Sequence, residues 1–570
     1  MIKILFRCDG GPIPEIGTGH VFRCLLIAEK LSKNKQIEIA FIMRNYKESI
    51  QLVKSRKFKV YTFNIEDDEI KATLDVIEKF LPDILIIDKL NNDENYLHKI
   101  KTKKQLVLIT LDDNKHGINY ADIKINAILT SKFKKRVTNL FQGFDYITIP
   151  EYSSKPKAIR KKGKKIFVSF GGYDHLNLTL KTLESLENIP ASVQILVVVG
   201  TSYKYKEQLD EFIRKSKRKY YIYYQPKKFK EILNSADIAV VSGGLTLFHA
   251  LSIGIPSVVI NQYKHQMNTA SKLSEKNAII NLGLGENVTK KTIFNTVNHL
   301  LQNYKLRSAL SDASKKIVDK KGLERVSELI LMVKELPWDT NFFGIKIARL
   351  LVPNLTEDIL YYTLKYCKLR NIKCLYFLCE IDDINTINLA KKHDFICVGV
   401  NLTFRHDLKN IPMCSNPRNI TIRESKNDDI PYLKNMTKNM YIFSRFYSDP
   451  HFSKKTCDRL YETWVENSCH GFADKVFVAE YKKKIVGYVT CHIDQKENFG
   501  RIGLIGVANR AQRKKIGTNL LNNALRWFKI QNVRYVLVST QDKNIQAQKL
   551  YKKCKFKILK KELWFHKWFE

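Results

Sequence analysis

The sequence predicts a multidomain α/β protein in which two parallel-sheet domains precede a further α/β region. Over residues 1–152, short β-branched runs alternate with amphipathic segments of helix length, and the same rhythm repeats over 153–333. From residue 335 onwards, a later strand pattern is followed by a basic turn and a long amphipathic helix. These observations predict two doubly wound domains in succession, then an α/β region of a different type.

Length and composition limit the possible classes. The chain has 570 residues, of which 44% are hydrophobic, which at about 150 residues per domain predicts three or four units with cores of their own. Its apolar runs, such as 195–199, are far shorter than the roughly 18 residues of a membrane span. The N-terminus begins directly with a strand pattern, without the apolar region of a signal peptide. We therefore expect a cytoplasmic protein without a membrane span.

The charge raises the question of nucleic acid. Lys and Arg number 97 against 57 Asp and Glu, a net charge of +40. Basic residues are concentrated in 155–165 and 214–219 but otherwise spread over nearly every predicted helix, which is typical of solvated surfaces. We expect anionic small substrates and no specific nucleic acid partner. The eleven cysteines have irregular spacing and no paired CxxC, so we predict no metal site.

The strands are predicted from β-branched runs in chain order. In the first block they are 2–6, 37–42, 59–63, 84–87 and 106–109, and in the second 166–170, 194–199, 238–241 and 257–260. A basic, Pro-containing stretch, 153–165, separates the two blocks, and helices over 290–333 close the second. A motif at 336–344 with Pro, Trp and Gly marks a new start, so we expect a third region over 335–410 and a fourth over 418–570.

A glycine-rich loop follows the first strand. After Arg7-Cys8-Asp9 the chain reads Gly17-Thr18-Gly19-His20 and enters an apolar helix that contains Arg23. Glycines at a strand-to-helix turn let the backbone approach a phosphate, which the helix N-terminus favours. A near-neutral imidazole in the first helical turn is suited to deprotonate a water or hydroxyl, so His20 is the candidate base.

Two further glycine pairs end strands of the second block. Gly171 and Gly172 follow one strand, and Gly243 and Gly244 follow another and open a helix at Leu245 and Thr246. Ligands of doubly wound sheets bind at the carboxyl ends of the strands. The three glycine loops therefore predict a nucleotide diphosphate bound between the two blocks.

Over about residues 1–330 the chain resembles the GT-B-like UDP-sugar hydrolases of pseudaminic acid biosynthesis, which are related to the GlcNAc transferase of peptidoglycan synthesis. The resemblance rests on the motifs above together with Asn177, Gly254-Ile255-Pro256-Ser257 and Gln266. It implies a UDP-2,4-diacetamido-2,4,6-trideoxy-β-L-altropyranose substrate, with His20 activating water at the anomeric carbon. The substrate-binding residues that we expect are Arg7, Asp9, Gly17, Gly19, Arg23, Gly171, Gly172, Gly243, Gly244, Leu245, Thr246, His249 and Gln266.

Two positions depart from this family. His249 stands where relatives have a Glu that holds the ribose, and Asp88-Lys89-Leu90 stands where they have Asp-x-Tyr. The first departure affects nucleotide contacts, and the second affects the positioning of substrate and water.

In the C-terminal region a strand that ends at Val507 is followed by a basic loop that contains Gln512-Arg513-Lys514-Lys515-Ile516-Gly517 and leads into a helix. Backbone amides at a helix N-terminus and nearby cations favour a pyrophosphate. The loop, with the later helix that contains Ala547 and Tyr551, resembles GNAT acetyltransferases and implies acetyl-CoA as acyl donor and Tyr551 as general acid to the thiolate. Lys515 and Lys555 replace glycines of the family patterns. The cofactor-binding residues that we expect are Val507, Gln512, Arg513, Lys514, Lys515, Ile516, Gly517 and Asn544.

The resemblance extends upstream through the motif at 336–344 and the segment 444–449 to the GNAT subgroup that N-acetylates 4-amino-sugar nucleotides, such as dTDP-fucosamine acetyltransferase. In that subgroup a degenerate GNAT-like half precedes the active one, which we assign to 335–410. The sequence does not identify the general base, and Asp494, Glu497 and a water chain are all open.

Together the two resemblances predict a bifunctional enzyme of nonulosonic acid biosynthesis that acetylates a UDP-linked 4-amino sugar and then hydrolyses the UDP-diacetamido sugar. One alternative makes the N-terminal half a glycosyltransferase, because a GT-B cleft does not choose between water and a sugar hydroxyl. A second alternative is a lysine-rich nucleic-acid or membrane-surface binder with decayed active sites.

Overall fold

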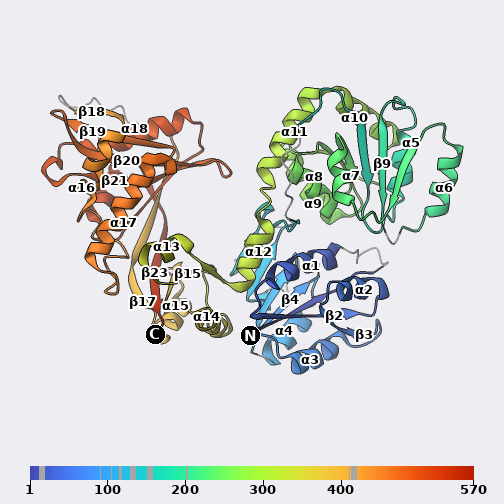
Figure 1. Cartoon of the computed structure of the whole chain (residues 1–570), viewed down its shortest axis with the longest axis horizontal. Coiled ribbons are helices and arrows are strands. Elements are labelled where there is room, and N and C mark those ends of the chain that lie inside the picture. The colour runs from blue at the N-terminus through green and yellow to red at the C-terminus, as the bar shows by residue number, and fades with distance from the viewer. Residues whose placement is uncertain are drawn as a thin grey trace. The chain divides into compact units, whose positions relative to one another are not determined.

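The chain forms two compact units, Met1–Met332 and Val333–Glu570 (Figure 1). The computed structural model describes residues 1–11, 19–89, 91–103, 105–113, 119–128, 137–150, 158–200, 203–409, 411 and 420–570. Within these ranges no helix has the length and apolar character needed to cross a membrane.

The N-terminal unit begins with a seven-stranded parallel sheet of order β3-β2-β1-β4-β5-β6-β7. Its strands are β1 (Ile2–Cys8), β2 (Ile37–Arg44), β3 (Lys59–Phe63), β4 (Ile84–Asp88), β5 (Val107–Leu111), β6 (Ile123–Asn126) and β7 (Leu140–Gln142). The helices between them are α1 (Gly19–Leu31), α2 (Lys47–Ser55), α3 (Glu69–Phe80) and α4 (Glu94–Lys103). Strands such as β4 are buried along their whole length, as expected for a parallel sheet covered on both faces.

A second, six-stranded parallel sheet follows in the order β10-β9-β8-β11-β12-β13. Its strands are β8 (Lys165–Ser169), β9 (Gln194–Val199), β10 (Tyr220–Tyr224), β11 (Ile238–Val241), β12 (Ser257–Asn261) and β13 (Ile280–Leu284). Its helices are α5 (Leu178–Ser185), α6 (Lys206–Lys215), α7 (Phe229–Ser235), α8 (Leu245–Ile253), α9 (Lys264–Glu275), α10 (Lys290–Gln302) and α11 (Tyr304–Ile317). The strand order reverses between β1 and β4 in the first sheet and between β8 and β11 in the second, and such switch points are where these folds bind ligands.

The last helix of the unit returns to the first sheet. Helix α12 (Gly322–Leu331) packs on α1 and on the short 3-10 turn at Phe144–Tyr146. A Cβ atom at Gly322 would lie 2.0 Å from the carbonyl oxygen of Ile147, so only glycine fits this approach. The chain thus closes the N-terminal unit by joining its end to its beginning.

Every strand predicted for this unit forms, which confirms the fold class, and the sheets also contain strands that the sequence pattern did not predict. Strand β6 is four residues long and contains Lys124, whose buried ammonium donates to the carbonyl of Thr138. Burial lowers the pKa of Lys124 to about 8. A charged residue in a four-residue strand removes the apolar pattern on which the prediction depends.

The C-terminal unit is built on one ten-stranded mixed sheet of order β14-β15-β16-β23-β17-β22-β21-β20-β19-β18. Its strands are β14 (Val333–Glu335), β15 (Ile347–Leu350), β16 (Cys374–Glu380), β17 (Ile396–His406), β18 (Ile420–Glu424), β19 (Lys475–Tyr481), β20 (Lys484–Asp494), β21 (Phe499–Val507), β22 (Val536–Gln541) and β23 (Lys557–Trp568). Its helices are α13 (Pro337–Phe343), α14 (Glu357–Leu369), α15 (Ile384–Lys392), α16 (Ile430–Thr437), α17 (Lys454–Asn467), α18 (Ile516–Ile530) and α19 (Ile545–Lys553).

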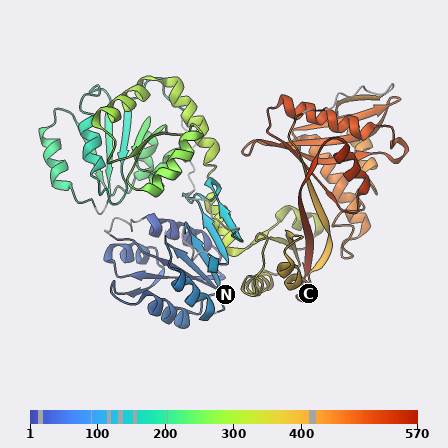
Figure 2. The same cartoon turned by 180° about the vertical axis from the view of Figure 1, so that it is seen from behind.

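One sheet contains strands from both regions expected in the C-terminal unit. The long strands β17 and β23 run side by side as an antiparallel pair (Figures 1 and 2), and β23 also pairs with β16. The two regions expected at 335–410 and 418–570 therefore share a single sheet, because the last strand of the chain is inserted between strands of the first region.

Two cores cover opposite faces of this sheet. On one face, α18 packs through Leu520 and Leu525 against a cluster that includes Phe404. On the other face, α17 contributes Leu460 to a cluster with Tyr376 of β16. The face beneath α17 is the one that carries the polar side chains described below.

Candidate active sites

The first candidate site lies at the switch point of the first sheet, where α1 begins beside the end of β4. His20 Nδ1 lies 2.6 Å from Asp88 Oδ1, and the Asp88 side chain is fully buried. Burial alone would raise the pKa of Asp88, but the charges and hydrogen bonds of Arg23 and His20 hold it well below its usual range. An ionised carboxylate only accepts, so Nδ1 carries the proton and Nε2 is the basic nitrogen. The pair therefore orients His20 as a base.

Arg23 is half-buried one helical turn after His20 and faces two carboxylates. Its Nε donates to Asp88 Oδ2 at 2.8 Å, and its Nη1 donates to Asp112. Burial opposes the charge of Arg23, yet Asp112 and Asp88 raise its pKa well above the usual value. The predicted substrate-binding residue Arg23 is thus held by the carboxylates that hold His20.

Arg7 and Asp9 belong to a second buried ion cluster. Arg7 Nη2 lies 2.7 Å from Asp9 and 2.9 Å from Glu69, and Lys89 Nζ donates to Glu69 at 2.7 Å. Asp9 Oδ1 also accepts from the backbone amide of Arg44 at 2.8 Å. The charges of Arg7 and Asp9 are consequently directed at each other and at their neighbours, in the positions where the sequence predicts substrate contacts.

The glycine pair at the end of β8 meets the glycine at the end of β9. A Cβ atom at Gly200 would lie 2.3 Å from the carbonyl oxygen of Gly171 and 2.4 Å from the Cα of Gly172. Gly171 also has a φ of 83°, in the left-handed region. Close approach therefore requires glycine at position 200, and the backbone conformation favours glycine at position 171.

The glycine pair at the end of β11 leads into α8. A Cβ atom at Gly243 would lie 2.7 Å from Asn261 Oδ1, whereas Gly244 has open space beside it and forms the N-cap without a side-chain cap. The amides of Leu245 and Thr246 follow it in the first turn, where backbone N–H groups lack partners within the helix. This helix start is suited to an anion.

The N-termini of α1 and α8 approach each other. A Cβ atom at Gly19 would lie 3.8 Å from Leu245 Cδ1. Across from α1, His265 at the start of α9 interacts electrostatically with His20, and burial together with this repulsion lowers the pKa of His265. The structure thus brings His20, Leu245 and His265 together, while the predicted residue Gly17 lies outside the described residues.

His249 and Gln266 lie on the second sheet's side of the site. Burial lowers the pKa of His249 to about 4, so its imidazole is neutral near pH 7. Gln266 Oε1 accepts from the backbone amide of Gln262 at 2.9 Å. Next to them, the rings of Tyr173, His175, Tyr263 and His265 stack in sequence, with planes within 15° of parallel. The site therefore has flat aromatic surfaces at the carboxyl ends of β8 and β12.

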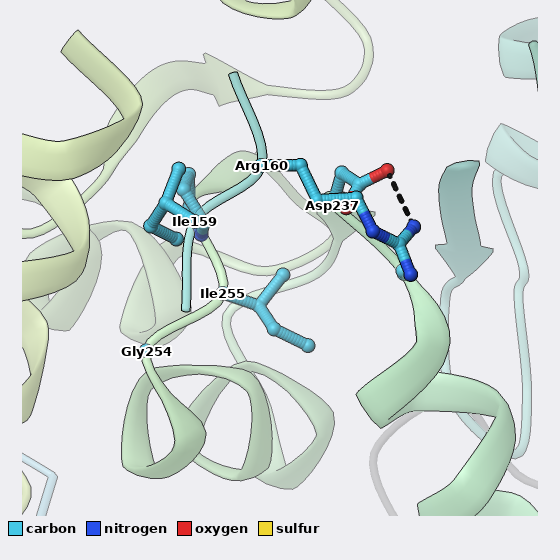
Figure 3. A pocket seen from close by; sticks show the side chains of 7 residues that line it. Ile159, Arg160, Asp237, Gly254 and Ile255 are labelled. Atoms are coloured by element: carbon cyan, nitrogen blue, oxygen red, sulfur yellow. Dashed lines mark hydrogen bonds and ion pairs between the residues drawn. The ribbon is translucent and has the colours of Figure 1, made fainter. Parts of the chain in front are cut away.

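The Gly254-Ile255-Pro256 motif lies elsewhere. Gly254 ends α8 with a φ of 78°, and the residues after it lead into the start of β12. Figure 3 shows Gly254 and Ile255 lining a depression with Arg160 and Asp237, which are joined by an ion pair of 3.3 Å. This depression is at the amino ends of β11 and β12, opposite the glycine loops, so the motif shapes a turn there.

The second candidate site is an opening inside the C-terminal sheet. Strand β21 pairs with β22 only at Gly500–Ile502, and within the described part of the chain its later residues, 503–507, have no register partner on β22. Unpaired strand edges offer backbone amides and carbonyls to an extended ligand. The opening is therefore a place where a flexible chain with amide groups could bind.

The loop after β21 leads to the N-terminus of α18. Lys515 is the N-cap with a φ of 62° and no side-chain cap, and Lys514 Nζ lies 4.4 Å from the ring of Tyr481. A Cβ atom at Gly517 would lie 3.3 Å from Leu550 Cδ2 and 3.7 Å from Val507 Cγ2. The start of α18, the end of β21 and α19 thus converge. The other predicted loop residues Gln512, Arg513 and Ile516 lie on the same turn, the first two exposed and Ile516 buried.

Asn544 and Tyr551 both belong to α19. The Asn544 side chain caps the helix by accepting from the amide of Ala547 at 3.1 Å. Tyr551 is 3% exposed and packs on Phe404 and Phe556, and burial raises its pKa. Its phenol is therefore neutral near pH 7 and able to donate a proton.

The hydroxyl groups of Tyr441 and Tyr488 lie 2.7 Å apart near Tyr551, which interacts electrostatically with Tyr441. Asp494 and Glu497, two of the alternatives left open for the general base, lie instead at the exposed turn between β20 and β21. In the antiparallel register, that turn is at the opposite end of β21 from Val507. Both carboxylates therefore lie at the end of β21 remote from residues 503–507.

Among the described side chains, no group of three or more His, Cys, Asp and Glu is arranged to hold a metal ion. Two family models match the chain. Residues 166–326 match the glycosyltransferase family 28 C-terminal domain, and residues 438–556 match the acetyltransferase (GNAT) family. The chain is a fusion of a family 28 type region with a GNAT domain.

Three curated relatives are similar to parts of this fusion. Spore coat polysaccharide biosynthesis protein SpsG of Bacillus subtilis is 28% identical over 340 residues, which are 56% of this chain and 96% of SpsG. The uncharacterized protein MJ1062 of Methanocaldococcus jannaschii is 31% identical over 46% of this chain and 57% of its own length. Spore coat polysaccharide biosynthesis protein SpsD of Bacillus subtilis is 26% identical over 23% of this chain and 45% of its own length.

The family 28 type region and the preceding sheet contain site residues that sequence reasoning missed. Asp88 was considered only as part of a departure from a family pattern, and Asp112 and His265 were not considered. An acidic residue at the carboxyl end of a buried apolar strand is the signal that identifies Asp88. In the GNAT domain, Tyr441 and Tyr488 were missed, since a single tyrosine in an apolar pattern does not differ from a core residue.

Proposed function

We propose that the chain is a bifunctional nucleotide-sugar enzyme of nonulosonic, pseudaminic-type acid biosynthesis. The GNAT domain N-acetylates a UDP-linked 4-amino sugar with acetyl-CoA, and the N-terminal unit hydrolyses the UDP-diacetamido sugar to free sugar and UDP. The observation that carries the second activity is the His20–Asp88 pair at the start of α1, next to the uncapped start of α8.

In the hydrolysis, His20 Nε2 takes a proton from water while the water oxygen attacks the anomeric carbon. The bond from that carbon to the diphosphate oxygen breaks, and its electron pair leaves with UDP. Backbone amides at the start of α8 face the developing negative charge, and UDP is stable enough as an anion to need no acid. Asp88 stabilises the imidazolium that forms on His20.

The opening in the C-terminal sheet fits acetyl-CoA on three grounds: unpaired edges of β21, free amides at the start of α18, and a neutral phenol at Tyr551. Acetyl-CoA supplies an acetyl group activated as a thioester. The loop amides bind its pyrophosphate, and Tyr551 lies on α19, which meets this loop at Gly517. The Tyr551 hydroxyl donates the proton that the departing sulfur requires when the substrate amine takes the acetyl group.

The relatives support a role in surface polysaccharides. SpsG and SpsD are both named as spore coat polysaccharide biosynthesis proteins, and this chain resembles each of them over different lengths. A fusion of two activities raises the local concentration of each active site near the other. Consecutive steps on one nucleotide sugar are consistent with that arrangement.

A second candidate function is glycosyl transfer by the N-terminal unit. The match of residues 166–326 to the glycosyltransferase family 28 C-terminal domain favours it. In that reaction His20 would deprotonate an acceptor hydroxyl in place of water, so the same His20–Asp88 pair serves both readings.

The test is a mass-spectrometric time course of the purified chain with UDP-4-amino-4,6-dideoxy-β-L-AltNAc, with and without acetyl-CoA. We expect a diacetamido UDP-sugar first and then UDP with free sugar. The second step should be lost in His20→Ala and the first in Tyr551→Phe. Acetylation without UDP release would favour the glycosyltransferase, and absence of both reactions would refute the proposal.

A further inference from the structure

The face of the C-terminal sheet beneath α17 carries two arginines that both contact one indole. The guanidinium carbon of Arg445 lies 4.4 Å from the ring centroid of Trp564, and that of Arg349 lies 5.3 Å from the same centroid. All three side chains are half-buried. We propose that Arg349, Arg445 and Trp564 bind the diphosphate of a nucleotide-linked acceptor of the GNAT domain.

Neither arginine has a carboxylate partner at ion-pair distance within the described ranges. The carboxylates that act on them are Asp339 on Arg445 and Glu562 on Arg349, and both act only electrostatically. Burial and repulsion from Arg445 lower the pKa of Arg349, and burial lowers the pKa of Arg445. Two half-buried cations without paired anions create a positive potential that favours an anionic ligand.

The orientation of the Arg445 side chain is fixed by His566 and Asp449. Its Nη1 donates to His566 Nε2 at 2.9 Å, and His566 Nδ1 donates to Asp449 Oδ2 at 2.6 Å. The guanidinium also lies 4.0 Å from the ring of Tyr376 and 4.3 Å from that of Phe446. Since one edge of the guanidinium is used by His566, the remaining N–H groups are available to a ligand. A guanidinium held in one plane is suited to bidentate contacts with phosphate oxygens.

The arginine site connects with the acetyl-transfer opening through the segment before Arg445. A Cβ atom at Gly506 of β21 would overlap the sulfur of Met440, and Tyr441 bonds to Tyr488 of β20. From Tyr441 to Arg445 the chain spans at most ~14 Å. A sugar diphosphate has comparable length, so an acceptor with its diphosphate at Arg445 can present its amine near the opening.

This inference rests on the proposed acetyl transfer and gives a structural reason for the proposed order of the two reactions. If the GNAT domain recognises the diphosphate, acetylation precedes the step that removes UDP. An acceptor recognised only by its sugar would not need two arginines. The choice between nucleotide-linked and free sugar is therefore decided at Arg349 and Arg445.

The first test uses the tryptophans as a local reporter, because all five (Trp338, Trp464, Trp527, Trp564 and Trp568) belong to the C-terminal unit. UDP is titrated into the full chain while tryptophan emission is recorded. We expect a saturable change, with the Kd raised at least tenfold in Arg349→Gln and in Arg445→Gln. Arg405→Gln is the matched control, since Arg405 stacks on Tyr535 at 4.2 Å but is paired with Asp407. No change in the wild-type emission, or equal titrations in all variants, would overturn the inference.

The second test measures acetyl transfer in the His20→Ala background, which prevents loss of the UDP-sugar. With the UDP-linked amine, each arginine variant should raise KM at least tenfold and leave kcat within threefold. With the same amino sugar lacking UDP, kcat/KM should change less than threefold. Equal losses of kcat/KM with both substrates would overturn the diphosphate assignment and leave the proposed acetyl transfer intact. If UDP binds as predicted in the first test but no acetylation is detected, the proposed function is refuted and the diphosphate site is not.

Discussion

The two candidate catalytic groups sit in opposite electrostatic environments. His20 in the N-terminal unit is surrounded by ionised partners, with Asp88, Arg23 and Asp112 in one connected set. Tyr551 in the C-terminal unit is surrounded by the apolar side chains of Phe404 and Phe556. A base that must accept a proton near neutral pH benefits from a fixed carboxylate, whereas an acid that must stay protonated benefits from burial. The two environments thus match the proposed roles, in which His20 accepts a proton and Tyr551 donates one.

The largest effect should follow removal of the base. His20→Ala should lower the rate of UDP release about 10³-fold, because general base catalysis is lost, and should leave acetyl transfer unchanged. Asp88→Asn should lower UDP release to a similar extent, since Asn does not enforce the tautomer with Nε2 as base. Rates are measured by mass spectrometry under single-turnover conditions. His98→Ala, at an exposed position on α4, serves as control, and equal rates in this control and His20→Ala would contradict the assignment.

Removing the acid should have the next largest effect. Tyr551→Phe keeps the packing against Phe404 and deletes only the hydroxyl, so acetyl transfer should fall about 100-fold, while UDP release from directly added UDP-diacetamido sugar is retained. The measurement is the initial rate of N-acetylation at saturating acetyl-CoA. Tyr432→Phe, 68% exposed on α16, is the matched control. A Tyr551→Phe enzyme with wild-type kcat would show that the thiolate leaves without this acid.

The third effect is a loss of stability of the C-terminal unit in acid, which follows from the buried imidazole of His566. Burial lowers the pKa of His566 to about 4, below its usual 6.5, so between pH 6.5 and 4 the unfolded chain binds a proton that the folded chain does not. The stability that His566 contributes is present above pH 6.5 and is lost as pH falls through this window. From pH 7 to pH 5 the loss should be about 2 kcal/mol.

This loss is measured by urea unfolding followed by tryptophan emission, which reports only the C-terminal unit. His566→Gln should show a smaller decrease between pH 7 and pH 5 than the wild type. An identical pH dependence in the variant would assign the decrease to other groups, such as His492 and His406, whose pKa values burial also lowers.

The smallest effect concerns backbone conformation in the C-terminal unit. Lys555 has a φ of 67°, where residues other than glycine are strained by about 1 kcal/mol. Lys555→Gly should therefore raise the free energy of unfolding by up to about 1 kcal/mol, and Lys552→Gly within α19 should lower it by a similar amount. Both are measured by the same urea titration. A decrease in stability for Lys555→Gly would mean that the lysine side chain makes a compensating contact.

The sequence predicted local strand-to-helix loops better than it predicted ion pairs and strand pairing between distant parts of the chain. The glycine loop before His20 and the basic loop before α18 were recognised because each is a local signal of a strand ending and a helix beginning. The ion pairs of Arg7 with Glu69 and of Arg23 with Asp112 were not predictable in the same way, because these carboxylates come from distant parts of the chain. The shared sheet of the C-terminal unit was also missed, since pairing of β23 with β16 joins the two ends of that unit.

By itself the sequence determined the α/β class, the positions of nine strands of the N-terminal unit and the two helix starts that are suited to phosphate. Periodicity and glycine placement are properties of neighbouring residues, so they can be read without the fold. Only the tertiary structure decided which charges meet: His20 bonds to a residue 68 positions away, and Arg445 to one 121 positions away. Contacts at such separations depend on strand order and register, which bring distant segments to one edge or one face of a sheet.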